Sequence, residues 1–311
     1  MNISVLYAAI IYSSMLGLMS FGVTFVKITS NVWNVAHTSF ITFAAYIVFT
    51  FESFYGNSPY LYLPLGFIIG AFLAIIEYLL IIDPLRKRGS SSLLMLVSTI
   101  AFLLIVDGII DIYSDYLQNI YKFPSKNFIL SYLDFNFLGF NGIFLFSFTF
   151  LIIILILLYL ILTYTKFGIA LRASVDDPIL ASVTGINIKY VNIFAWFIAG
   201  GTAGIAGALL PMWTQCFPGV GDTFLAIIFS VSIVGGVQQI YGTFLGSFLI
   251  GFIQIFGILG LSIIFGSSIL VYQYLIPMII MILVLLFLPE GLGKINFRKI
   301  IINIKKRRQK K

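Results

Sequence analysis

The sequence predicts an all-α membrane protein, a polytopic bundle of transmembrane helices with about 8–10 membrane segments. Of its 311 residues, 60% are hydrophobic and 9% are charged, and the mean hydropathy is +1.09. Soluble domains average roughly 25% charged residues, so a water-soluble fold of this length would need far more polar surface. Residues 142–165, 191–210 and 243–271 carry no charge, and each stretch can cross a hydrocarbon core of about 30 Å as a helix. A β-barrel would show short alternating segments instead.

Nine helical segments are expected, with boundary errors of several residues. The first, 4–26, lacks the positive start and the cleavage site of a signal peptide, so we expect it to be retained as a membrane helix. The segments at 36–54 and 222–237 are short or interrupted, which makes them candidates for re-entrant rather than spanning elements. The other six have the length and apolar character of spanning helices and cover 62–83, 92–113, 142–165, 190–210, 241–264 and 269–288.

The distribution of basic residues predicts the orientation of the single transmembrane domain expected over residues 1–311. If the C-terminus is cytoplasmic and nine spans alternate, 16 of the 18 Lys and Arg residues fall inside, and only Lys122 and Lys126 fall outside. This bias follows the positive-inside rule and puts the N-terminus outside. The tail at about 294–311 is then a basic cytoplasmic segment with affinity for anionic lipid, so the net charge of +7 requires no nucleic-acid partner. The longest outside loop is expected at about 114–141.

No motif points to an enzyme or to ATP binding by this chain. The sequence contains no G-x-x-x-x-G-K-[ST] stretch, so no P-loop is expected. It contains no H-E-x-x-H motif, one histidine (His37) and one cysteine (Cys216), so neither a metal site nor an intrachain disulfide is expected. We therefore expect no cofactor and no catalytic residue, and a transporter or channel component is the default function.

Acidic residues inside the expected membrane helices support an alternative, an ion-coupled secondary transporter of a small solute. Asp107 and Asp111 lie four residues apart on one helix face, where they would form a cation or proton site, or would be solvated carboxylates beside an aqueous cavity or interface. Glu77 lies six residues before the loop DPLRKR, and Arg86 of that loop is a candidate partner for it. A third hypothesis, a membrane receptor or scaffold, has no positive support.

Glycine spacing predicts close packing between helices. Small residues four positions apart let helix backbones approach closely in lipid. Two such pairs are present, Gly200 with Gly204 and Gly242 with Gly246. Gly235 and Gly236 end the short 222–237 segment and are candidates for a helix break at membrane depth, a feature that lines substrate paths in some transporters.

A polar segment of about twenty residues, 171–190, interrupts the apolar sequence and carries start and stop signals for a short helix. Asp177 is a favoured N-cap, and Pro178 falls at the first helical position, where its missing N–H is not needed. Gly185 is the favoured residue just past a helix end. The enclosed helix has about two turns and a length of about 10 Å, far too short to span a membrane.

This short helix is expected to expose a small apolar patch formed by Ile179, Leu180 and Val183. A two-turn helix is marginal alone in water, so it needs a surface on which to dock. The residues leave two alternatives open. The helix binds a groove on a separate cytoplasmic protein, or it rests on the bilayer or on its own bundle.

Five stretches of the chain resemble, in order, motifs of the permease subunits of branched-chain amino-acid ABC importers. They are NVAHTSF (34–40), EYLLIIDPLRKR (77–88), LRASVDDPILASVTGINIKYVN (171–192), VGGVQQIYGTFLGSF (234–248) and LLFLPEGLGK (285–294). The resemblance extends over nearly the whole chain. The chain departs from it at Thr38 and Ser39, where the family has a glycine and usually an acidic residue, and at Thr184, where leucine is usual.

The resemblance implies a multi-pass cell-membrane permease subunit of an ATP-driven importer for branched-chain or related amino acids. Its partners would be a second permease, homologous or identical, two cytoplasmic ABC ATPase subunits and an extracytoplasmic solute-binding protein. The short helix would couple the permease to the ATPase through Asp176, Asp177, Pro178, Ile179, Leu180, Ala181, Val183 and Gly185. Residues expected near the translocation path are Asn34, His37, Gly235 and Gly236. The ligand stays open among leucine, isoleucine and valine, other amino acids, and small amides.

Overall fold

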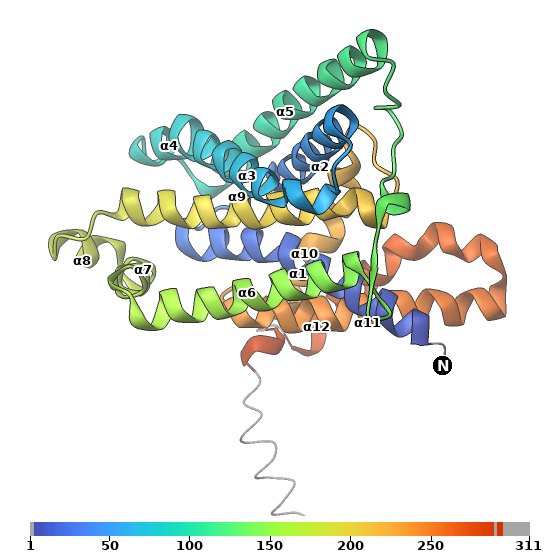
Figure 1. Cartoon of the computed structure of the whole chain (residues 1–311). Coiled ribbons are helices and arrows are strands. Elements are labelled where there is room, and N and C mark those ends of the chain that lie inside the picture. The colour runs from blue at the N-terminus through green and yellow to red at the C-terminus, as the bar shows by residue number, and fades with distance from the viewer. Residues whose placement is uncertain (1–2, 289–290, 295–311) are drawn as a thin grey trace, which may run out of the picture.

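A computed structural model describes residues 3–288 and 291–294, and this part of the chain is a bundle of helices (Figure 1). The α-helices are α1 (Ile3–Ser30), α2 (His37–Tyr55), α3 (Leu63–Glu77), α4 (Asp83–Lys87), α5 (Ser92–Ile120), α6 (Gly142–Tyr164), α7 (Lys166–Asp176), α8 (Pro178–Val183), α9 (Ile188–Trp213), α10 (Leu225–Gly235), α11 (Ile240–Phe265) and α12 (Leu275–Phe287). Shorter helical turns are η1 (Pro59–Tyr62), η2 (Tyr78–Ile82), η3 (Ser131–Leu133), η4 (Val220–Phe224), η5 (Ser267–Tyr274) and η6 (Leu292–Lys294). Strands β1 (Asn136–Phe137) and β2 (Phe140–Asn141) form an antiparallel hairpin.

All nine expected segments are helical, which confirms the all-α polytopic class. Among the described residues, seven helical units are long and apolar enough to cross a membrane, namely α1, Pro59–Lys87, α5, α6, α9, α11 and Ser267–Phe287. The two expected segments outside this set are α2 and Val220–Gly235, the ones that the sequence marks as short or interrupted. The expected basic tail at 294–311 lies outside the described residues except for Lys294, which ends η6.

Helices α1 and α9 form the centre of the bundle. Nearly every residue of α1 is buried beyond its first two turns, and α9 is buried over most of its length. Helices α6, α9, α10 and α11 pack around α1, whereas α2 and α3 pack on α9. Helices α5, α6, α11 and α12 lie further out and expose many large apolar side chains, as expected for surfaces that contact lipid.

Glycines allow the closest of these contacts, between α3 and α9. Gly200 and Gly204 on α9 face Gly70 and Gly66 on α3, and the backbones touch there. A Cβ built on Gly66 would lie 2.8 Å from the carbonyl oxygen of Gly204, which is closer than real side chains approach. Any larger residue at these four positions would therefore push the two helices apart.

A second glycine contact joins α10 to the start of α11. Gly242 packs directly against the carbonyl oxygen of Gly235. A Cβ on Gly246 would lie 2.7 Å from the carbonyl oxygen of Val231 and 2.8 Å from the amide nitrogen of Gly235. Both predicted glycine pairs therefore lie where two helix backbones meet.

Two segments do not cross the bundle as continuous helices. After α1 the chain reverses at Asn31, whose φ of 53° is left-handed, and α2 does not begin until His37. The His37 Nε2 atom lies 3.0 Å from the carbonyl oxygen of Met19, so α2 begins beside the middle of α1. The start of the η4–α10 unit meets α2 at the same depth, where the Gly221 N–H donates to Thr42 Oγ1 at 2.9 Å. Both are therefore half-helices that begin inside the bundle.

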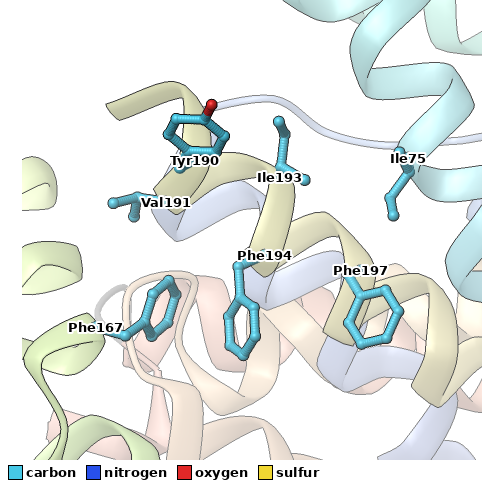
Figure 2. A pocket seen from close by; sticks show the side chains of 7 residues that line it. All are labelled: Ile75, Phe167, Tyr190, Val191, Ile193, Phe194 and Phe197. Carbon is cyan, nitrogen blue, oxygen red and sulfur yellow. The ribbon is translucent and has the colours of Figure 1, made fainter. Parts of the chain in front are cut away.

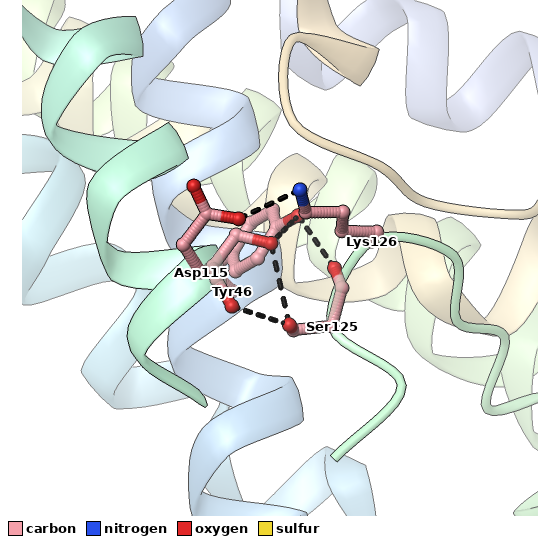
Figure 3. Close-up of polar contacts among 5 residues, drawn as sticks. Tyr46, Asp115, Ser125 and Lys126 are labelled. Atoms are coloured by element: carbon pink, nitrogen blue, oxygen red, sulfur yellow. Dashed lines mark hydrogen bonds and ion pairs between the residues drawn. The ribbon is translucent and has the colours of Figure 1, made fainter. Parts of the chain in front are cut away.

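The connection between α5 and α6 starts later than the expected 114–141 loop, because α5 continues to Ile120. Tyr46 on α2 donates a hydrogen bond to the carbonyl oxygen of Ser125 at 2.7 Å, and the Ser125 hydroxyl donates to the carbonyl oxygen of Ser114 at 2.6 Å (Figure 3). Lys126 also pairs with Asp115 at 2.7 Å, but both side chains are more than half exposed, so this pair contributes little. The buried hydroxyls fix the loop to the bundle.

The same loop crosses the end of α9. Phe128 and Cys216 exchange two backbone hydrogen bonds, with N···O distances of 3.0 and 2.7 Å. The Leu130 N–H donates to the carbonyl oxygen of Pro211 at 2.8 Å. This end of the bundle, which also holds the β1–β2 hairpin, lies opposite α4 and α8 (Figure 1).

Candidate functional site

Polar residues lie around the start of α2 and its contact with η4, and we call them the central polar cluster, namely Asn34, His37, Thr38, Thr42, Glu77 and Asp222. Thr38 in the first turn of α2 donates to Asp222 Oδ1 at 2.6 Å. Asp222 itself lies in the first turn of η4. The carboxyl group is thus close to the N-terminal ends of both half-helices, where unpaired backbone N–H groups favour negative charge.

Glu77 and Asn34 form a buried pair within this cluster. The Asn34 Nδ2 atom donates to Glu77 Oε2 at 2.7 Å, and neither residue is more than 1% exposed. Glu77 Oε1 and Asn34 Oδ1 have no hydrogen-bond partner among the described residues. The one hydrogen bond of this pair joins the entry to α2 to the end of α3.

The expected pairing of Glu77 with Arg86 is wrong. Arg86 lies nine residues further along, which is about 13 Å on a helix. Its guanidinium donates to the carbonyl oxygen of Ser30 at 2.6 Å, where it caps the C-terminal end of α1. With the side-chain amide of Asn192 oriented to satisfy its neighbours, the Asn192 oxygen also accepts from Arg86 at 2.6 Å.

His37 is completely enclosed and anchors the start of α2. Its Nε2 atom lies against the carbonyl oxygen of Met19, and its Nδ1 atom has no partner among the described residues. The ring fits there because residue 22 is glycine, where a Cβ would lie 2.8 Å from His37 Nε2. The part of the chain that the structure describes contains no group of three or more His, Cys, Asp or Glu side chains that could hold a metal.

Asp107 and Asp111 have different surroundings despite sharing a helix face. Asp107 is partly buried near Asp222, and its Oδ1 atom has no hydrogen-bond partner among the described residues, whereas Asp111 is exposed. Sequence reasoning missed Asp222. The available signal was an isolated acidic residue in the glycine-containing stretch PGVGDT between two apolar segments.

Gly235 and Gly236 end a half-helix rather than interrupt it. Helix α10 ends at Gly235, and Gly236 has a φ of 104° that only glycine adopts easily. Ser232, one turn earlier, accepts a hydrogen bond at 2.7 Å from Thr24, near the end of α1. The two glycines therefore form the end of α10, next to the last two turns of α1.

The short helix predicted in the polar segment is α8, and its caps are those the sequence indicates. Asp177 Oδ1 accepts hydrogen bonds from the N–H groups of Ile179 and Leu180 at 2.9 and 3.0 Å. Pro178 occupies the first helical position, and Gly185 follows the helix end with a φ of 90°. These local interactions position α8 outside the bundle, beside α7 (Figure 1).

The expected apolar side chains of α8 form what we call the exposed patch, made of Ile179, Leu180 and Val183. They are 78%, 61% and 79% exposed, whereas Ala181 on the opposite face is 3% exposed and packs inward. Asp176 is exposed beside the patch. The exposed patch is therefore available to a separate protein or to the membrane surface.

Sequence reasoning missed α7, the helix that carries α8. The side chain of Thr165 caps its first turn by accepting from the N–H of Gly168 at 3.2 Å. Arg172 donates to the carbonyl oxygen of Leu162 at the end of α6. The polar segment is therefore a structured unit of two helices fixed to α6.

The end of the bundle that carries α8 is basic, and we call it the basic end. Lys189 beside α8 lies 3.6 Å from Asp83 of α4, which also pairs with Lys87 at 2.8 Å. The basic residues of α1, α4, α7 and α9 and of the turn after α4 lie at this end, and they are Lys27, Arg86, Lys87, Arg88, Lys166, Arg172 and Lys189. Lys122 and Lys126 lie in the α5–α6 connection at the opposite end.

Comparison with known proteins identifies the family. A family model described as "Branched-chain amino acid transport system / permease component" matches residues 5–285. The chain is 40% identical over 296 residues to a probable branched-chain amino acid transport permease protein LivH of Methanocaldococcus jannaschii, covering 95% of this chain and 94% of the relative. It is 32% identical over 143 residues to the permease protein BraD of Pseudomonas aeruginosa and 29% identical over 145 residues to LivH of Escherichia coli, covering 45% of this chain and 44% of each relative.

No solved structure matches the chain significantly. The family match covers α8, both half-helices and nearly all of the spanning helices. Members of this family are transport subunits of the membrane, which fits a multi-pass bundle and does not favour a solitary ion-coupled carrier. The chain is therefore a multi-pass membrane protein of the branched-chain amino acid ABC transport permease family.

Proposed function

We propose that this chain is the membrane-spanning permease subunit of an ATP-driven importer of branched-chain or related amino acids, and that α8 couples it to a separate ATPase. The observation that carries the coupling proposal is the exposed patch on a capped helix at the basic end. The substrate class follows from the names of the relatives. The partners are a second permease, homologous or identical, two cytoplasmic ABC ATPase subunits and an extracytoplasmic solute-binding protein.

The basic end is proposed to face the cytoplasm. Up to the end of α9, seven basic residues lie at this end and two at the other, and the positive-inside rule associates this asymmetry with the cytoplasmic side. Helix α8 then faces the compartment that holds ATP, and the α5–α6 connection and the N-terminus face outside. Unlike the proposed ATPase partners, this chain carries no P-loop sequence, so hydrolysis belongs to those partners.

The translocation path is proposed to run past the half-helices. Asn34 and His37 are at most 1% exposed, so they support the wall of the path and do not line it. Asp107 on α5 and Asp222 on η4 remain partly exposed, so we assign their carboxyl groups to the polar side of the wall of the translocation path. Unwound backbone and half-helix ends at membrane depth are typical of substrate paths in transporters.

The substitution Leu180→Asp tests the coupling proposal. Burying a leucine side chain contributes roughly 1.5–3 kcal/mol, and the aspartate would also place a charge in the interface. ATPase association should therefore weaken about 10-fold or more, since each 1.4 kcal/mol is a factor of ten. The measurement is co-purification of the ATPase with the permease, together with ATP-dependent transport.

Two control variants separate docking from general damage. Ser182→Ala is a mild change on α8 itself, and Leu138→Asp puts the same charge on an 84% exposed side chain at the opposite end of the bundle. Both should retain the ATPase. Normal ATPase binding and transport by Leu180→Asp would show that α8 is only a connection between two helices.

Labelling with a membrane-impermeant maleimide tests the orientation. The native Cys216 is fully buried, so it should remain silent in intact cells. Leu138→Cys should react from outside, and Ser182→Cys should react only after the membrane is permeabilised. The reverse pattern would overturn the proposed topology while leaving the fold unaffected.

A further inference from the structure

An apolar groove runs along α9 between α3 on one side and α6 and α7 on the other. Its wider part has a volume of 560 Å³ and lies among Ile75, Phe167 and Tyr190 (Figure 2). A second part of 210 Å³ continues deeper, between Phe67 and Ile161. Both parts share Phe194 and Phe197 as lining residues, so they form one continuous surface.

Four phenylalanines line this groove in a row, and we call it the aromatic groove after them. The ring centroids of Phe167 and Phe194 are 4.4 Å apart, those of Phe194 and Phe197 are 6.3 Å apart, and those of Phe197 and Phe67 are 5.4 Å apart. Figure 2 shows Phe167 of α7 beside Phe194 of α9 at the wide part. The row joins helices that are distant in sequence.

The groove has the length and polarity that suit a hydrocarbon chain. Its lining residues on α9 run from Tyr190 to Thr202, a distance of about 18 Å along a helix. The Thr202 hydroxyl already donates to the carbonyl oxygen of Ala199 at 2.8 Å. The other lining side chains, apart from the Tyr190 hydroxyl, are purely apolar, so water gains no hydrogen bonds there.

The mouth of the aromatic groove lies at the basic end. Lys166 precedes the lining residue Phe167 on α7, Lys189 precedes the lining residue Tyr190 on α9, and both lysines are exposed. Asp83 is shared between Lys87 at 2.8 Å and Lys189 at 3.6 Å, so one carboxylate neutralises only part of this charge. Tyr190 is 70% exposed, as befits an aromatic residue at a membrane interface.

We propose that the aromatic groove binds one acyl chain of an anionic phospholipid whose phosphate lies against Lys166 and Lys189. The deeper part of the groove lies on α9 between α3 and α6, which all belong to units long enough to span, so hydrocarbon is the surrounding solvent there. The positive mouth selects an anionic headgroup over a zwitterionic one, because basic pockets between membrane helices attract acidic lipids. The bound lipid holds α7, and with it α8, against the bundle.

Native mass spectrometry of the full-length, detergent-purified protein tests this proposal. The probes are phosphatidylglycerol and phosphatidylcholine with identical acyl chains, added separately after delipidation. We expect at least fivefold greater retention of phosphatidylglycerol. The double variant Lys166→Gln/Lys189→Gln should remove this preference, whereas Lys122→Gln/Lys126→Gln, which loses the same charge at the opposite end, should keep it.

A second pair of variants tests the groove itself. Ile198→Trp fills the deeper part and should lower retention of both lipids by at least threefold. Leu104→Trp, on a side chain 65% exposed on α5, should leave retention unchanged. Equal retention of the two lipids by the native chain, or an equal loss in both lysine double variants, would overturn the proposal. Disulfide formation between two copies of Phe194→Cys would also overturn it, because a second permease would then occupy the groove.

Discussion

Replacing Gly204 by alanine should separate α3 from α9. The added Cβ would overlap the carbonyl oxygen of Gly66 and lie 2.7 Å from its carbonyl carbon. Carbon atoms in good contact are about 3.5–4.0 Å apart, so the helices would have to move by about 1 Å. Overpacking of this kind typically costs about 1–3 kcal/mol. At about 2–3 °C per kcal/mol for a chain of this size, we expect the midpoint of thermal unfolding in detergent to fall by about 2–9 °C.

The same substitution at Gly108 provides a matched control. A Cβ on this residue of α5 meets nothing within 4 Å. Alanine is preferred over glycine in a helix by up to about 1 kcal/mol, so the midpoint should stay the same or rise. Equal midpoints for Gly204→Ala and Gly108→Ala would refute the claim that the α3 and α9 backbones touch.

Two further substitutions address the central polar cluster. Glu77→Ala leaves the buried amide of Asn34 without its acceptor and should lower the free energy of unfolding by about 1–3 kcal/mol. Glu77→Gln keeps an accepting oxygen, so its free energy of unfolding should fall clearly less in the same thermal assay. Thr42→Val removes the acceptor for the Gly221 N–H and should increase hydrogen exchange at that amide. The control Thr29→Val, whose hydroxyl bonds only within α1, should leave this exchange unchanged. Unchanged exchange in Thr42→Val would contradict the contact between the half-helices.

Local signals predicted α8 to within one residue. The Asp177 cap, Pro178 at the first helical position and Gly185 after the end each act through neighbouring backbone atoms, so their effect is visible without the fold. The exposed patch was predicted from the same signals, because a two-turn helix is too short to fold back and bury its outward apolar face against the bundle. Apolar length alone likewise predicted the spanning helices.

Contacts between distant segments could not be predicted in this way. Thr38 and Asp222 are 184 residues apart, and nothing near Asp222 shows that a second half-helix begins beside it. The partners of Gly200 and Gly204 were also missed, because Gly66 and Gly70 acquire their role only when α3 crosses α9. Spacing shows that a helix can be approached closely, but only the fold shows which helix approaches.

The central placement of α1 has a consequence for how the protein is made. Of the seven helical units that could cross a membrane, α1 and α9 are the least apolar and the most buried. Ser13, Ser20 and Thr24 are fully buried on α1, and the Thr24 hydroxyl meets Ser232 and Thr243, which are translated more than 200 residues later. During synthesis the Thr24 hydroxyl therefore has only its partner within α1 until α10 and α11 are made, so the centre of the bundle is completed late.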